Sequence, residues 1–186
     1  MASASPILPD YVELRCLSNF SFLRGASHPE ELVERARKLG YMALAITDEC
    51  SMAGVVRAHV AAKEQGLPLL IGSQFEVEAD AGGDAALGPF TLVVIACNGN
   101  GYGNLCEFIT RLRRASPTKG TYRLRAADLD PQALTDCVVL ASPRRPATPE
   151  QLLAIARWVL DRFMGRCWLG VELLRRLDDE MWLYRL

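Results

Sequence analysis

The pattern of hydrophobic and polar positions is clearest between residues 40 and 76. Residues 42–46 form a nearly unbroken apolar run, which is typical of a strand buried on both faces. Apolar positions then recur at helical spacing up to Gly66, where a helix is expected to end, and residues 68–71 form a second apolar run. Strand, helix and strand in this order predict a βαβ unit with parallel strands. The predicted apolar face of the helix consists of Met52, Val55, Val56 and Val60.

The same alternation continues on both sides of this stretch. An alternating run predicts a first strand over residues 11–15, and residues 74–78 are predicted to extend the third strand. Further apolar runs predict strands at 90–96, 137–141 and 167–173, separated by helices. We therefore expect an α/β fold in which parallel strands alternate with outer helices.

The length of the chain sets the expected domain organisation. We expect a flexible N-terminus over residues 1–10 and a single domain over residues 11–186. Closed α/β barrels typically need about 250 residues. Six predicted strands in 186 residues therefore indicate a sheet that stops before it closes. Apolar side chains near its end should then be exposed, namely Leu173, Leu174, Met181, Trp182 and Leu183.

Two predicted helices begin at capping sequences. Ser27 is predicted to cap the first, with Glu30 reaching back to it, which makes His28 the first helical residue. Thr148 and Gln151 are predicted to form a second capping box.

Composition and charge exclude several classes of protein. Half of the residues are hydrophobic, which is enough for a core, and the formal net charge of −1 attracts neither nucleic acid nor membranes. No apolar stretch approaches 18 residues and the N-terminus lacks a secretion signal, so we expect a cytoplasmic protein without a membrane span. The six cysteines form no Cys-x-x-Cys pair, which predicts mostly buried thiols and no zinc site.

A basic cluster surrounds the end of the helix predicted over residues 102–114. It could contact nucleic-acid phosphates, but a solvated surface with cations near a helix C-terminus is the preferred interpretation. Its members are Arg111, Arg113, Arg114, Lys119, Arg123 and Arg125.

Polar side chains follow two neighbouring predicted strands. Asp48 and Glu49 come directly after the strand at residues 42–46, and Gln74 follows the next apolar run. Because α/β sheets and barrels bind ligands beyond the carboxyl ends of their strands, we expect these side chains to line a functional mouth.

The stretch over residues 20–75 resembles a known family. Its sequence reads FSFLRGASHPEELVERARKLGYMALAITDECSMAGVVRAHVAAKEQGLPLLIGSQF. It closely resembles the N-terminal PHP (polymerase and histidinol phosphatase) domain of bacterial DNA polymerases of the DNA polymerase III alpha-subunit type. Within that family it is most similar to the error-prone, damage-inducible translesion branch. The resemblance implies a distorted (β/α)7 barrel, of which this chain would hold most but not all.

The resemblance also implies a much longer DNA-directed DNA polymerase, a nucleotidyltransferase of damage-induced mutagenesis and DNA repair. Such a protein acts on template-primer DNA together with accessory mutagenesis proteins, and it binds magnesium in a palm domain that lies outside this sequence. We therefore expect this chain to need no cofactor, to contact the remainder of the polymerase, and to be inactive alone.

The metal positions of the family are mostly substituted here. The histidines that follow the first strand in metal-binding members correspond to Arg15 and Leu17, and the ligand of the next loop corresponds to Arg24. The histidine of the family's Thr-Asp-His motif corresponds to Glu49. Arginine cannot ligate a metal ion and repels it, so we expect neither metal nor catalytic residues. The remaining substituted positions are Gln74, Thr91 and Arg176.

Three interpretations of the function follow from these substitutions. The preferred one is a non-catalytic structural and partner-contact module of an error-prone polymerase. The alternative is a metal-dependent phosphoesterase acting as a proofreader or pyrophosphatase. A third possibility is that Arg15 and Arg24 bind an anion without cleaving it.

The two arginines also suggest how the mouth stays folded without metal. Side chains on adjacent parallel strands can reach one another. Our hypothesis is that Arg15 or Arg24 pairs with Asp48 or Glu49 in place of the metal ions. The competing interpretation is four solvated charges on loops.

Overall fold

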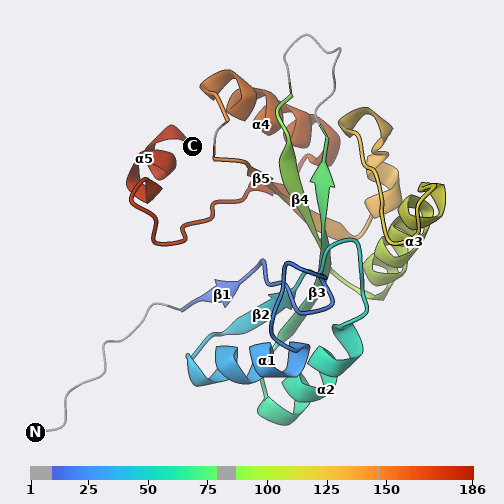
Figure 1. The fold of residues 1–186 in the computed structure, drawn as a ribbon, viewed down its shortest axis with the longest axis vertical. Helices are drawn as coiled ribbons and strands as arrows, with labels where there is room; N and C mark the ends of the chain where they lie inside the picture. Colours follow the sequence, from blue (N-terminus) through green and yellow to red (C-terminus); the bar gives the residue numbers. More distant parts are fainter. Residues whose placement is uncertain (1–9, 79–86, 146) are drawn as a thin grey trace, which may run out of the picture. The chain divides into compact units, whose positions relative to one another are not determined.

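The computed structural model describes residues 10–78, 87–145 and 147–186 of the chain. The chain forms two compact units, residues 1–71 (unit 1) and residues 72–186 (unit 2). Apart from Asp10, the segment predicted to be flexible lies outside the described residues. The strands pair in their order along the sequence, from β1 to β6, and β3 contributes residues to both units (Figure 1).

Unit 1 contains the predicted βαβ unit. β2 pairs in parallel with both β1 and β3, as the sequence pattern predicts. The elements are β1 (Val12–Glu13), α1 (Pro29–Lys38), β2 (Ala43–Ile46), α2 (Val55–Gln65) and the first residues of β3 (Leu69–Val77). Their core consists of Val33, Ala36, Leu44, Ile46, Ala58, Ala61, Ala62 and Leu67.

The buried face of α2 differs from the predicted one. Val55 is buried as expected, but Val56 and Val60 are exposed. The core side of the helix is made by Ala58, Ala61 and Ala62, whose small side chains let the helix approach its neighbours closely. The prediction failed because it followed the larger apolar side chains, whereas the packing places the alanines inside.

The helix starts show where proline decides the register. α1 begins at Pro29, so His28 is the N-cap and not the first helical residue, and Ser27 does not cap the helix. Proline favours the first helical position because its missing N–H would have no partner there. The backbone nitrogen of His28 donates to Glu31 Oε2 (2.7 Å). The capping box of Thr148 and Gln151 at the start of α4 (Pro149–Phe163) is confirmed.

Unit 2 is a mixed sheet with helices. α3 packs against β3 through an edge-to-face contact of Phe108 with Phe75, and α4 packs against β4 through Trp158 and Phe90. Besides the end of β3, unit 2 contains β4 (Phe90–Ala96), α3 (Gly99–Ala115), two 3-10 turns (Ala126–Asp128 and Pro131–Leu134), β5 (Cys137–Pro143), α4, β6 (Cys167–Leu169) and α5 (Asp179–Arg185).

Strand β4 is antiparallel to β3 and to β5, which corrects the prediction of an all-parallel sheet. The chain between β4 and β5 passes along the sheet twice. After α3 it reaches Tyr122, whose hydroxyl accepts a hydrogen bond from the backbone nitrogen of Glu76 beside the start of β4. It then returns to the end of β4, where the backbone nitrogen of Cys97 donates to the carbonyl of Asp136 (2.9 Å). β5 therefore begins where β4 ends. The α/β class is confirmed, and β5 and β6 are parallel.

The C-terminal segment is only partly exposed. Leu173, Leu174, Met181 and Leu183 are exposed, as predicted. Trp182 is buried, which contradicts the prediction, because α5 packs it against Ala147 and Leu152. β6 is also shorter than expected and ends at Leu169.

Candidate functional site

The carboxylate of Asp48 lies at the end of β2 in a shell of serine donors. Asp48 is 1% exposed. Its Oδ1 accepts hydrogen bonds from the backbone nitrogen of Ser18 (2.8 Å) and from Ser21 Oγ (2.7 Å), and its Oδ2 accepts one from Ser18 Oγ (2.7 Å). Three neutral donors thus surround a buried carboxylate that would otherwise be costly to remove from water.

The loop between β1 and α1 places both serines. It folds into a tight turn in which the backbone nitrogens of Arg24 and Gly25 both donate to the carbonyl of Ser21 (2.9 Å each). A Cβ atom at Gly25 would lie 1.9 Å from the carbonyl oxygen of Ser18. A Cβ atom at Gly54 would lie 3.0 Å from Asp48 Oδ2. The loop therefore requires glycine at Gly25, and a side chain at Gly54 would press on the carboxylate of Asp48.

An ion pair adjoins the serine shell. Arg24 Nη1 donates to Glu49 Oε2 at 2.5 Å, and the two side chains are 38% and 21% exposed. Ser21 Oγ also accepts a hydrogen bond from the backbone nitrogen of Glu49 (2.9 Å), so this serine connects Glu49 with Asp48. Asp48 and Glu49 thus share one hydroxyl, and Glu49 pairs with an arginine, as the ion-pair hypothesis predicted for Arg24.

The residues that follow β1 make contacts with Glu13 and Thr47. The backbone nitrogen of Arg15 donates to Glu13 Oε1 (3.0 Å), and Leu17 is half-buried. Next to them the backbone nitrogen of Cys16 donates to Thr47 Oγ1 (3.1 Å). Burial raises the pKa of the Cys16 thiol to about 12, with smaller contributions from the charges of Glu13 and Asp48.

The remaining positions that the sequence analysis aligned with family ligands, Gln74 on β3, Thr91 on β4 and Arg176 before α5, all lie in unit 2, and Arg176 is exposed. Gln74 is fully buried, and Thr91 Oγ1 donates to Glu76 Oε1 (3.0 Å). Glu76 Oε2 accepts a hydrogen bond from Arg144 Nη2 (2.8 Å). This group is a second place where an arginine neutralises a carboxylate, and the sequence analysis did not single out Glu76 or Arg144.

The described donor set does not fit a metal ion. Within residues 10–78, 87–145 and 147–186, no group of three or more His, Cys, Asp or Glu side chains is placed to hold one. His28 caps α1, with Nδ1 2.8 Å from Asn19 Nδ2, and His59 is exposed on α2. The donors at the mouth are serine hydroxyls already directed at Asp48 and a carboxylate paired with arginine, and neither arrangement suits a metal ion.

Three of the six members of the basic cluster around the end of α3 are paired with carboxylates. Arg111 pairs with Glu107, Arg123 with Glu78 and Arg125 with Asp128. Arg113 donates to the carbonyl of Gly120 and lies over the ring of Tyr122. These contacts favour the solvated surface over a phosphate-binding one.

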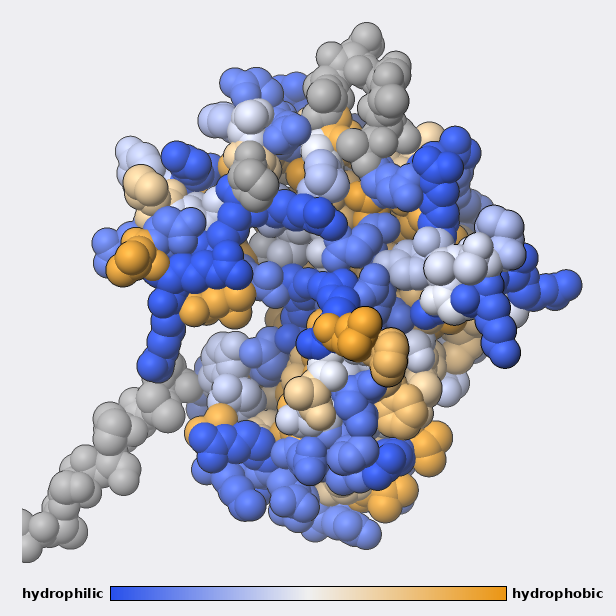
Figure 2. Space-filling model, in the orientation of Figure 1, coloured by the Kyte–Doolittle hydropathy of each residue, from blue (hydrophilic) through white to orange (hydrophobic). Residues whose placement is uncertain are grey.

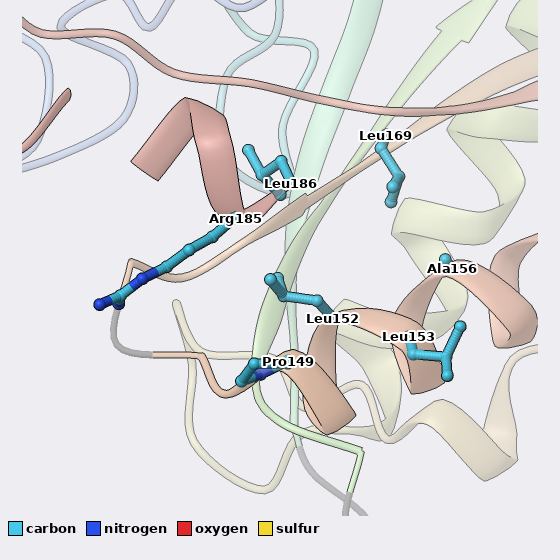
Figure 3. A pocket seen from close by; sticks show the side chains of 7 residues that line it. All are labelled: Pro149, Leu152, Leu153, Ala156, Leu169, Arg185 and Leu186. Carbon is cyan, nitrogen blue, oxygen red and sulfur yellow. The ribbon is translucent and has the colours of Figure 1, made fainter. Parts of the chain in front are cut away.

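An apolar pocket lies within unit 2 between α4, β6 and α5. Its volume is about 210 Å³, and Figure 3 shows Leu152, Leu169 and Leu186 around it while the Arg185 side chain extends away. The other lining residues are Pro149, Leu153 and Ala156. The pocket offers little for chemistry because its lining is almost entirely aliphatic.

The cysteines are less buried than the sequence predicted. All six cysteines are thiols without disulfide bonds, but only Cys50 and Cys137 are buried, so the prediction of mostly buried thiols was wrong.

No helix in the described part of the chain combines the length and the apolar character needed to cross a membrane.

The serine shell was missed by the sequence analysis. Ser18 and Ser21 lie in the loop that follows the first strand, in the spacing Ser-x-x-Ser, and this loop ends at Gly25. The available signal was two small hydroxyl residues in the loop between Leu17 and Arg24. Serine carries no charge, so the charge pattern of the sequence does not indicate these donors.

Comparison with known proteins gives one family and a set of long relatives. The PHP domain profile matches residues 13–153. The error-prone DNA polymerase of Bordetella bronchiseptica is 51% identical over 185 residues, which cover 95% of this chain and 17% of the relative. The error-prone DNA polymerase of Ralstonia nicotianae is 52% identical over 181 residues, which cover 92% of this chain and 16% of the relative. The chain thus spans about one sixth of the length of these relatives.

A solved structure shares the fold. A candidate metal-dependent phosphoesterase from Bifidobacterium adolescentis superimposes with a TM-score of 0.64 at 18% identity, covering 96% of this chain and 83% of the other. At this identity the likeness concerns the fold alone.

Proposed function

The chain belongs to the PHP domain family, and we propose that it serves as a non-catalytic structural and partner-contact module of an error-prone DNA polymerase. The similarity to error-prone polymerases confirms the resemblance recognised in the sequence. We place the module at the N-terminus of that polymerase.

The observation that carries this proposal is the set of contacts made by Asp48 and Glu49 at the end of β2 in unit 1. In a metal-dependent hydrolase, carboxylates and imidazoles converge on the ions. Here Asp48 accepts hydrogen bonds from Ser18 and Ser21, and Glu49 pairs with Arg24. These contacts support a site that is held together by hydrogen bonds and an ion pair, and that takes no cofactor.

The proposal also covers the whole polymerase to which this module would belong. In it, nucleotidyl transfer on template-primer DNA would take place in a palm domain with magnesium, during translesion synthesis and DNA repair in the cytoplasm. The module would contact the remainder of the polymerase and, through it, accessory mutagenesis proteins.

Two assays on purified proteins test the proposal. The chain alone should neither extend a primer nor hydrolyse phosphoesters with manganese or zinc. A chimera in which this chain replaces the matching region of the Bordetella bronchiseptica polymerase should extend a primer, whereas that polymerase without the region should be unstable or inactive. If the chain hydrolyses phosphoesters and Asp48→Asn abolishes this activity, the chain is a phosphoesterase instead. A chimera that folds but does not extend a primer would argue against the polymerase module.

A further inference from the structure

The loop between β1 and α1 exposes large apolar side chains beside the serine shell. Phe22 is 84% exposed and Leu23 is 90% exposed, and Phe20 is exposed as well. We call these three residues the apolar tip. Figure 2 shows apolar surface in the region where this loop, dark blue in Figure 1, crosses unit 1. Single exposed apolar side chains are common, but several gathered on one loop are typical of a surface that binds a partner.

The apolar tip is held in place by buried groups below it. Ser21, between Phe20 and Phe22, is buried and bonded to both Asp48 and the backbone of Glu49. The backbone nitrogen of Asn19 donates to the carbonyl of Ser27 (2.8 Å), which closes the base of the loop. An ordered apolar loop loses little conformational freedom on binding, so it is suited to an interface.

Leu23 adopts a backbone conformation that its side chain disfavours. Its φ angle is 61°, in the left-handed region where glycine is the favoured residue. Because the side chain is almost fully exposed, no packing within unit 1 explains a leucine at this position. Backbone strain of this kind is typical of binding and switch regions.

We propose that the apolar tip docks onto the polymerase polypeptide outside this domain. The inference rests on the proposed function. The long relatives have about five sixths of their length outside the region matched by this chain, so under the proposed function the loop has a large covalently linked partner. The adjacent cation, Arg24, is already paired with Glu49, so the tip offers apolar contact and not a charge for phosphate. The occupant is therefore an apolar groove of another polymerase domain.

Hydroxyl-radical footprinting with mass spectrometry tests this directly. The oxidation rates of Phe22 and Leu23 are compared between the 186-residue chain and the full-length Bordetella chimera. We expect a decrease of about fivefold or more in the chimera, as for side chains that pass from solvent into a buried interface. Val56 and Val60, which are 71% and 51% exposed on α2, are the matched control and should keep their rates. Unchanged rates for Phe22 and Leu23 overturn the proposal, even where the chimera extends primers.

The variant Leu23→Gly separates docking from folding. Glycine accepts the φ angle of 61°, so the isolated chain should keep or raise its melting temperature. In the chimera the same change should restore the oxidation of Phe22 and lower the melting temperature. A lower melting temperature of the isolated chain would show a structural role and overturn the proposal. Protection that appears only with template-primer DNA, or in the isolated chain at high concentration, would equally overturn it in favour of nucleic acid or a second copy.

Discussion

Ser18 donates two hydrogen bonds to Asp48 across 30 residues of sequence, from its backbone nitrogen to Oδ1 (2.8 Å) and from its Oγ to Oδ2 (2.7 Å). The same residue thus joins the loop after β1 to the end of β2 by backbone and side chain together. Ser21 adds a third donor. The buried carboxylate is thus satisfied by neutral donors.

Removing these donors should destabilise the fold. We expect Ser18→Ala and Ser21→Ala each to lower the free energy of unfolding by about 1–3 kcal/mol, because each leaves a buried carboxylate short of a hydrogen bond. Ser27→Ala, in the same loop, is the control and should change it by less than about 0.5 kcal/mol. Urea unfolding measures all three. Equal effects of the three substitutions would contradict the role of the serine shell.

The Arg24–Glu49 pair should be weakly coupled. Both side chains keep contact with solvent, so a double-mutant cycle of Arg24→Ala and Glu49→Ala should give about 0.2–1 kcal/mol. The pair of Arg57 and Glu30, at 49% and 34% exposure, provides a comparison on the same unit. A coupling energy of zero would contradict the hypothesis that this ion pair stabilises the mouth in place of metal ions.

Metal ions should not stabilise the chain. Manganese, zinc or EDTA should leave its melting temperature unchanged, because Arg24 would repel a cation from Glu49 and the serine hydroxyls are already bonded to Asp48. Thermal denaturation and elemental analysis after dialysis measure this. One equivalent of retained zinc or manganese would contradict it.

The thiols should differ in reactivity. Burial raises the pKa of Cys16 to about 12 and that of Cys137 to about 11, whereas Cys97 is exposed. Iodoacetamide at pH 8 should therefore modify Cys97 first, as mass spectrometry of the peptides will show. These folded-state pKa values lie above the unfolded value of about 8.5, so folding favours the protonated thiols. Their contribution to the free energy of unfolding is fully present below pH 8.5 and is lost as the pH rises toward 12. Equal labelling of Cys16 and Cys97 would contradict the expected order.

Arg145 should hold the C-terminal segment in place. It donates to Asp178 Oδ1 (2.9 Å), to Asp179 and to the carbonyl of Glu172 (3.1 Å). Arg145→Ala should make α5 more sensitive to protease and shift the fluorescence of the buried Trp182 to the red. Arg157→Ala, an exposed arginine of α4, is the control and should change neither.

The same contact should weaken in acid. Burial raises the pKa of Asp179, but the hydrogen bonds and charge of Arg145 outweigh it, and the pKa lies below its usual value. The stabilisation is therefore present above the unfolded pKa and is lost as the pH falls through the folded one. A protease sensitivity of α5 that stays constant down to strongly acidic pH would contradict this assignment.

The sequence by itself determined the elements whose evidence is local. The apolar runs and helical spacing of unit 1 identified the parallel βαβ unit, because burial on both faces and helical periodicity leave their marks within a few residues. It also placed Asp48 and Glu49 at the end of β2 and Arg24 in the loop above. The structure brings Arg24 and Glu49 to 2.5 Å.

Only the tertiary structure decided features that depend on distant contacts. The direction of β4 follows from the return path through Tyr122 and Asp136, and an apolar run reads the same in either direction. The choice of serines as donors to Asp48 depends on a loop that lies about 30 residues away, held by close backbone approach at Gly25. The burial of Trp182 likewise depends on α5 reaching α4, which local periodicity does not encode.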